Sequence, residues 1–168
     1  MKDALLLLNE KQISQKINRL AFQLYEDNFE EETLVLAGVA PRGTIIAQRL
    51  KKVLEKISDL KITTVDVEIA EREKIVPLVR LSVNASEIEG CAVVLVDDVL
   101  NSGKTLTHAL GAFLTVPLKK LRTVVLVDRN HKVYPVATDF AGLSLSTVSQ
   151  EHVDVKMGEG AEESVYLR

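Results

Sequence analysis

The sequence predicts an α/β protein built on an open, mostly parallel, twisted sheet with helices on both faces. Three apolar runs carry this prediction: Thr33–Val39, Cys91–Val96 and Thr123–Val127. Each run is continuously apolar, as expected for strands buried on both faces of a parallel sheet. Segments with helical periodicity separate them, and the order strand, helix, strand predicts right-handed crossovers in a doubly wound sheet.

The helices are predicted from capping and periodicity. Asn9 and Gln12 have the spacing of a capping box, and four apolar residues then fall on one helical face: Ile13, Ile17, Leu20 and Leu24. A second helix is predicted over Ile45–Ile57, after the turn Ala40–Gly43. A third, Gly103–Val116, follows the central strand.

The remaining strands are shorter or more polar. Lys61–Ile69 alternates between apolar and polar residues, and Pro77–Val83 is predicted as a further strand. Beyond Asp128 the chain contains only short alternating pieces, Val136–Phe140 and His152–Lys156, which predict a small hood. We therefore expect one domain over residues 1–168, with a core at roughly 30–130 and a hood at roughly 130–168 that includes the N-terminal segment.

Composition limits the classes of partner. Hydrophobic residues make up 46% of the chain and charged residues 27%, which is typical of a globular protein. No segment approaches the ~20 apolar residues of a membrane span, so no membrane partner and a cytoplasmic location are expected. The single cysteine, Cys91, excludes an intrachain disulfide. The net charge of −3 does not favour RNA, which is left open as a partner.

The segment Asp97–Thr105 (DDVLNSGKT) has the composition of a phosphate site. In open α/β sheets ligands bind beyond the carboxyl ends of the strands. Ser102, Gly103, Lys104 and Thr105 lie where a helix begins, so free backbone N–H groups and two hydroxyls form an anion cradle. A nucleotide P-loop is excluded, because it needs a glycine where this chain has Asp98.

Two adjacent carboxylates ahead of an anion cradle suit a sugar phosphate. Asp97 and Asp98 could accept hydrogen bonds from vicinal hydroxyls or hold Mg²⁺ through water, while the loop binds the phosphate. The alternative is an acidic pair that only caps the strand end. The attached sequence Asn-Ser-Gly-Lys-Thr favours the ligand site.

These motifs resemble a known family. Val93–Thr105 (VVLVDDVLNSGKT) is similar to the phosphoribosyl pyrophosphate motif of type I phosphoribosyltransferases, and Val39–Gly43 (VAPRG) is similar to their pyrophosphate loop. Among these proteins the likeness is closest to the PyrR group, pyrimidine-operon attenuators that also carry uracil phosphoribosyltransferase activity. It continues through Leu126–His131 (LVDRNH), Pro135 and Asp139-Phe140.

The resemblance implies roles for the motif residues. Pro41, Arg42 and Gly43 would bind pyrophosphate, with Arg42, Asp97 and Asp98 as the catalytic residues and Mg²⁺ held indirectly by the two carboxylates. The donor would further contact the loop after these carboxylates: Val99, Leu100, Asn101, Ser102, Gly103, Lys104 and Thr105. Arg72, Asp128 and Arg129 would supply lid, metal or pyrophosphate contacts, and His131, Tyr134 and Phe140 would contact the base.

Two departures from the family pattern matter. Purine enzymes usually carry an acid where this chain has Asn101, and an amide cannot serve as a general base, which favours a pyrimidine. The expected lid, Ala70–Pro77 (AEREKIVP), looks shorter than in members of the PyrR group, although Arg72 and Lys74 could reach a phosphate.

Two functions follow as expectations. The first is transfer of a phosphoribosyl group from phosphoribosyl pyrophosphate to a nucleobase, with uracil favoured. The alternative is a regulatory protein that senses the donor or nucleotides, with or without RNA binding. A dinucleotide-binding fold is not favoured, because Gly38 and Gly43 do not have the required spacing. A homodimer or higher homo-oligomer is expected, with the first helix or Arg49–Leu54 as its surface.

Overall fold

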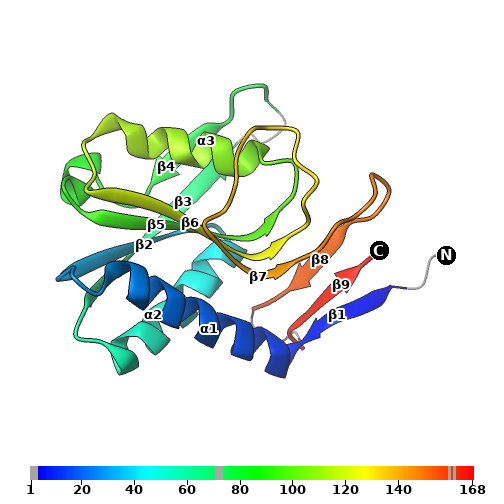
Figure 1. The fold of residues 1–168 in the computed structure, drawn as a ribbon. Helices are drawn as coiled ribbons and strands as arrows, with labels where there is room; N and C mark the ends of the chain where they lie inside the picture. Colours follow the sequence, from blue (N-terminus) through cyan, green and yellow to red (C-terminus); the bar gives the residue numbers. More distant parts are fainter. Residues whose placement is uncertain (1–3, 71–73, 159, 161) are drawn as a thin grey trace.

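The computed structural model describes residues 4–70, 74–158, 160 and 162–168. Its main sheet has six strands in the order β4-β3-β2-β5-β6-β7 (Figure 1). These strands are β2 (Thr33–Val39), β3 (Lys61–Ala70), β4 (Leu78–Leu81), β5 (Ala92–Leu100), β6 (Lys120–Asp128) and β7 (Phe140–Ser144). Only the β3–β4 pair is antiparallel. The prediction of an open, mostly parallel sheet is confirmed.

Helices cover both faces of this sheet (Figure 1). Helices α1 (Glu10–Asn28) and α2 (Arg42–Ile57) pack on one face, and α3 (Lys104–Ala112) packs on the other. The capping box predicted at Asn9 is present, since its side chain accepts from the backbone N–H of Gln12 at 2.9 Å. Helix α3 is shorter than predicted, because the chain tightens into a 3₁₀ turn at Phe113–Thr115 ahead of Pro117.

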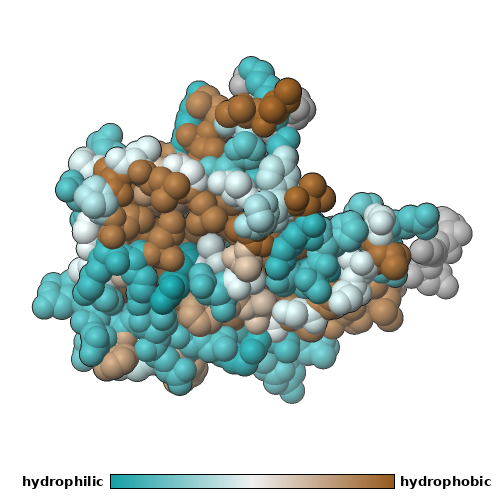
Figure 2. Space-filling view, turned by 45° about the horizontal axis from the view of Figure 1, so that its top comes forward, coloured by the Kyte–Doolittle hydropathy of each residue, from teal (hydrophilic) through white to brown (hydrophobic). Residues whose placement is uncertain are grey.

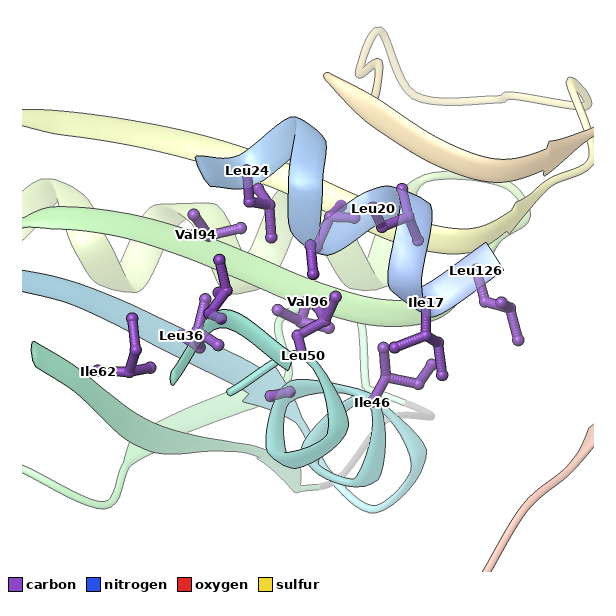
Figure 3. Close-up of a cluster of buried hydrophobic side chains, with 14 of the residues drawn as sticks. Ile17, Leu20, Leu24, Leu36, Ile46, Leu50, Ile62, Val94, Val96 and Leu126 are labelled. Carbon is purple, nitrogen blue, oxygen red and sulfur yellow. The ribbon is translucent and has the colours of Figure 1, made fainter. Parts of the chain in front are cut away.

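The larger core lies between the sheet and helices α1 and α2 (Figure 3). Its fully buried side chains include Leu20 and Leu24 of α1, Ile46 and Leu50 of α2, and Val96 of β5. Each such side chain contributes about 1.5–3 kcal/mol through burial. Val96 directly precedes the acidic pair Asp97-Asp98. The packing of Val96 in the core therefore fixes the backbone position at which this pair begins.

Part of the stretch Arg49–Leu54 makes internal contacts, and its expected role as an association surface stays a prediction. Leu50 and Leu54 are fully buried. Arg49 donates to the Ser14 hydroxyl of α1 at 2.8 Å and forms an ion pair with Glu163. These contacts join α2 to α1 and to the C-terminal segment.

A second, antiparallel sheet has the order β1-β9-β8, with β1 (Leu5–Asn9), β8 (Val153–Lys156) and β9 (Ser164–Leu167). It brings the N-terminal and C-terminal segments side by side (Figure 1). The predicted strand at Val136–Phe140 is wrong: the strand begins at Phe140 and extends the main sheet beside β6. No described helix is long and apolar enough to cross a membrane.

Candidate active site

The strand register brings the predicted site residues to one edge of the main sheet. Gly38 of β2 pairs with Val96 of β5, so the turn after β2 lies beside the acidic pair. At the other side of β5, Leu100 pairs with Asp128 of β6. Because parallel strands end at the same edge, the turn, the acidic pair and Asp128 share it.

Glycine lets the turn before α2 approach β5 closely. A β-carbon on Gly43 would lie 2.4 Å from the carbonyl oxygen of Val96, and one on Gly38 would lie 2.5 Å from the Cα of Thr44. Any larger residue would push the helix away from the strand. Arg42, the first residue of α2, and Asp98 of β5 therefore come into contact.

Asp97 and Asp98 are only 7% and 8% exposed. One carboxylate oxygen of Asp98 forms an ion pair with Nε of Arg42, and the other accepts from the backbone N–H of Val99 at 2.9 Å. Asp97 accepts from the N–H of Asp98 at 2.8 Å. These three side chains border a cavity of about 190 Å³, whose other walls are Val39, Ala40 and Pro41. The Arg42 guanidinium stays half-exposed at its mouth.

The loop after β5 forms a small hollow at the start of α3. Gly103 has a φ of +85° and precedes the first residue of the helix, so its backbone conformation favours glycine. The hollow has a volume of about 40 Å³, and its walls include Asp97, Asn101, Ser102, Gly103 and Thr105. The predicted anion cradle is thus continuous with the acidic pair through Asp97.

Lys104 does not face this hollow. Its ammonium donates to the carbonyl oxygen of Lys74 at 3.2 Å, which ties the start of α3 to the segment between β3 and β4. The expected lid, Ala70–Pro77, lies in that segment. Arg72, which was expected to contribute from it, lies outside the described residues.

Arg129 is held by acceptors inside the protein. Its side chain is buried, with only 4% of the residue exposed. The guanidinium donates to Asn101 Oδ1 at 3.2 Å, to the Thr147 hydroxyl at 2.8 Å and to the carbonyl oxygen of Val148 at 3.2 Å. These internal acceptors engage the guanidinium of Arg129, and its expected pyrophosphate or metal contact stays a prediction.

The residues expected near the base divide into two groups. Phe140 was expected there wrongly, because it lies at the opposite end of β7, paired with Val124, and packs into the core. His131 and Tyr134 lie on the segment that covers the loop after β5, where the N–H groups of Val133 and Tyr134 both donate to Ser102 O at 2.9 Å. A contact between either side chain and a base stays a prediction.

Sequence reasoning missed the residues that follow β7. An open hollow of about 360 Å³ is bordered by Asp128, Asn130, Ser144, Leu145 and Ser146. Asp128, at the end of β6, forms one of its walls, and the metal or pyrophosphate contact expected of Asp128 stays a prediction. The segment after β7 carried no motif, and its place became visible only once β7 paired beside β6.

Comparison with known proteins identifies the family. The model of the phosphoribosyl transferase domain matches residues 5–159. The chain therefore belongs to the phosphoribosyl transferase family and is a phosphoribosyltransferase of type I. Within the family it belongs to the PyrR group. It is 34% identical to the bifunctional protein PyrR of Clostridioides difficile over 96% of both chains, and 32% identical to that of Macrococcus caseolyticus over 99% of both.

Solved structures agree on the fold. The hypoxanthine phosphoribosyltransferase of Trypanosoma cruzi superposes with a TM-score of 0.78 at 20% identity, covering 98% of this chain and 96% of that one. A hypoxanthine-guanine phosphoribosyltransferase of Bacillus anthracis gives 0.72 at 24% identity, covering 86% and 84%. At this identity the likeness concerns the fold.

Proposed function

We propose that this chain transfers the phosphoribosyl group of phosphoribosyl pyrophosphate to uracil, forming a nucleoside monophosphate and pyrophosphate. One observation carries the proposal: Arg42, from the turn after β2, contacts Asp98, from the end of β5, beside the cradle at Ser102–Thr105. A cation, a buried acidic pair and an anion cradle thus meet at one sheet edge, in the order that pyrophosphate, ribose and 5′-phosphate require.

The pyrophosphate end of the donor is assigned to the cavity beside Arg42. Nε of Arg42 is engaged by Asp98, and within the described chain its two terminal nitrogens donate to no other group. They supply a fork of donors that suits phosphate oxygens. The backbone around Gly43 adds N–H groups at the start of α2.

Ribose is assigned to Asp97 and Asp98, and the 5′-phosphate to the loop after them. In the reaction the bond from C1 of the ribose to pyrophosphate breaks, with the electron pair leaving on pyrophosphate. A ring nitrogen of the base forms the new bond to C1, and its proton is released to the medium. Buried carboxylates beside the ribose stabilise the positive charge that develops on the sugar in between.

Mg²⁺ fits this site indirectly. Both oxygens of Asp98 already accept from Arg42 and Val99, and the described residues contain no group of three or more acidic, histidine or cysteine side chains that could hold a metal. Asp97 and Asp98 would therefore hold the ion through water or ribose oxygens. When bound, Mg²⁺ neutralises part of the pyrophosphate charge.

The base is assigned to the hollow after β6 and β7, beside Asp128 and Ser144–Ser146. Uracil is favoured by membership of the PyrR group and by Asn101, which cannot exchange a proton with a purine nitrogen. The alternative function, donor or nucleotide sensing with RNA binding, has weaker support. Arg19 of α1 is already engaged, because its guanidinium donates to the carbonyl oxygens of Ala141 and Gly142.

A homodimer or higher homo-oligomer is proposed as the working form. Apolar side chains are exposed on β1 and α1, among them Leu5 and Phe22 at 60% and 53%. Figure 2 shows a separate gathering of hydrophobic surface on the upper half of the visible face, which is the α3 side of the sheet in Figure 1. Sedimentation that gives only monomer at micromolar concentration would remove this proposal.

Nucleotide formation from phosphoribosyl pyrophosphate and Mg²⁺ tests the function directly. The bases compared are uracil, orotate, hypoxanthine, guanine, xanthine and adenine. Uracil-dependent turnover is the expected result. Turnover with a purine alone would refute the assignment of the base, and turnover with none would favour the sensing function.

A further inference from the structure

Arg129 joins the three loops that leave β5, β6 and β7. It follows Asp128 at the end of β6, and its guanidinium donates to Asn101 after β5 and to Thr147 and Val148 after β7. The residue is 96% buried, with 4% exposed. Arg129 is thus a buried cation held by three acceptors from two other loops, and it fixes the positions of these loops relative to one another at this edge of the sheet.

This contact fixes the orientation of the Asn101 amide. A guanidinium has only donors, so the amide oxygen of Asn101 must face Arg129. The amide NH₂ therefore points away from Arg129. Asn101 is exposed at the surface, and its NH₂ donates to no other described residue. A donor of known direction thus stands free at the end of β5.

The NH₂ group of Asn101 lies between the two halves of the proposed site. Asn101 precedes Ser102 in the loop assigned to the 5′-phosphate and borders the same hollow as Asp97. Its partner Arg129 lies between Asp128 and Asn130, which border the hollow assigned to the base. A base that attacks the ribose must lie where these halves meet.

We propose that the Asn101 NH₂ donates to a carbonyl oxygen of the nucleobase and that Arg129 is the positioning residue that aims and polarises it. This inference rests on the proposed function. It assigns the base class as one with a carbonyl next to the reacting ring N–H, as at C2 and N1 of uracil. A base without that carbonyl gives the amide nothing to bind.

The arrangement also acts on the chemical step. As the base nitrogen bonds to C1 and loses its proton to the medium, electron density that builds on the ring is shared by the adjacent carbonyl oxygen. A preorganised donor at that oxygen stabilises this charge, and the positive guanidinium behind the amide strengthens the donor.

A purely structural role for Asn101, as an anchor for Arg129, predicts a different result for one substitution. Asn101→Asp keeps an oxygen acceptor for the guanidinium and adds an ion pair, but it removes the NH₂ donor. If Asn101 only anchors Arg129, turnover should survive this change. If its NH₂ binds the base, turnover should fall, because removing such a hydrogen-bond donor typically lowers kcat by about 10²–10³-fold.

The experiment compares the parent chain, Asn101→Asp and Arg129→Lys. We expect Asn101→Asp to lose roughly 100-fold in kcat with uracil while its Kd for phosphoribosyl pyrophosphate, measured by calorimetry, stays within about threefold. Arg129→Lys keeps the charge but not the three-way fork, so we expect a smaller loss of kcat at similar donor affinity. Thermal unfolding of each variant verifies that it is folded.

A second substrate separates chemistry from structure. The ring N–H of 5-fluorouracil is more acidic than that of uracil, so its anion needs less stabilisation. The loss caused by Asn101→Asp should therefore be smaller with 5-fluorouracil, whereas a structural defect slows both bases equally. Uracil turnover by Asn101→Asp within about threefold of the parent, or equal losses with both bases, would overturn the inference. Absence of turnover by the parent with every base would instead refute the proposed function, and the inference with it.

Discussion

Gly43 lies so close to Val96 that a β-carbon at position 43 would stand 2.4 Å from the Val96 carbonyl oxygen. The neighbour is backbone, so it cannot rotate aside. The first turn of α2 and the end of β5 therefore have one permitted separation, and the contact between Arg42 and Asp98 depends on it.

Gly43→Ala is expected to destabilise the protein by about 1–3 kcal/mol, because the helix must shift away from the strand. The shift also moves Arg42 from Asp98, so the affinity for phosphoribosyl pyrophosphate should fall. Gly111→Ala is the matched control, since a β-carbon there meets no atom within 4 Å. In the last turn of α3 this change should stabilise the protein by up to about 0.5–1 kcal/mol. Urea unfolding followed by circular dichroism measures both, and equal stability of the two variants would contradict the prediction.

Asp98→Asn should lower uracil turnover by about 10²–10³-fold, because it removes a buried charge at the proposed ribose site and the ion pair with Arg42. Steady-state kinetics at saturating donor measures the loss in kcat. The control is Asp59→Asn, an exposed carboxylate between α2 and β3, away from the carboxyl ends of the strands. Similar losses in both variants would show that the effect is not specific to the site.

Asp27 should make the stability depend on pH on the acid side. Burial acts to raise the pKa of Asp27, but hydrogen bonds and charge from Arg122 and Lys120 outweigh it and hold the pKa below its ordinary value of 3.8. A depressed carboxyl pKa contributes stability that is present above the unfolded value and is lost as the pH falls through the folded one.

We therefore expect Asp27→Asn to unfold more easily than the parent at pH 7 and the difference to shrink as the pH falls below about 4. Thermal unfolding across this range measures the difference, with Glu89→Gln as an exposed control. A difference that stays constant with pH would contradict the assigned role of the ion pairs at 3.0 and 3.1 Å.

Arg19→Ala should destabilise the protein by about 1–3 kcal/mol, because its guanidinium joins α1 to β7 through the carbonyl oxygens of Ala141 and Gly142 at 2.9 and 2.7 Å. Lys11→Ala, an exposed change on the same helix, should have little effect.

The variants also test RNA binding. Retention of a structured RNA that falls with added salt and is lost in Arg19→Ala, without loss of stability, would favour the sensing function.

The sequence determined much of the fold through local signals. Continuous apolar runs marked β2, β5 and β6, and the capping box at Asn9 marked the start of α1. The motif Asp97–Thr105 indicated the edge of the sheet where the proposed site lies. It covers the end of one strand and the start of one helix, and the hydrogen-bonding groups free at these ends are set by residues that are neighbours in the chain. These features are readable because their causes lie within a few residues.

Tertiary structure decided the rest, because it depends on contacts between residues far apart in the chain. Nothing local marks Arg129 as buried: its acceptors, Asn101, Thr147 and Val148, lie 18 or more residues away. Phe140 is an aromatic residue in the segment expected to contact the base, but the register of β7 beside β6 places it at the opposite end of the strand. The sequence therefore indicated the proposed donor site, while the pairing of β7 and the burial of Arg129 decided which side chains the structure leaves accessible beside it.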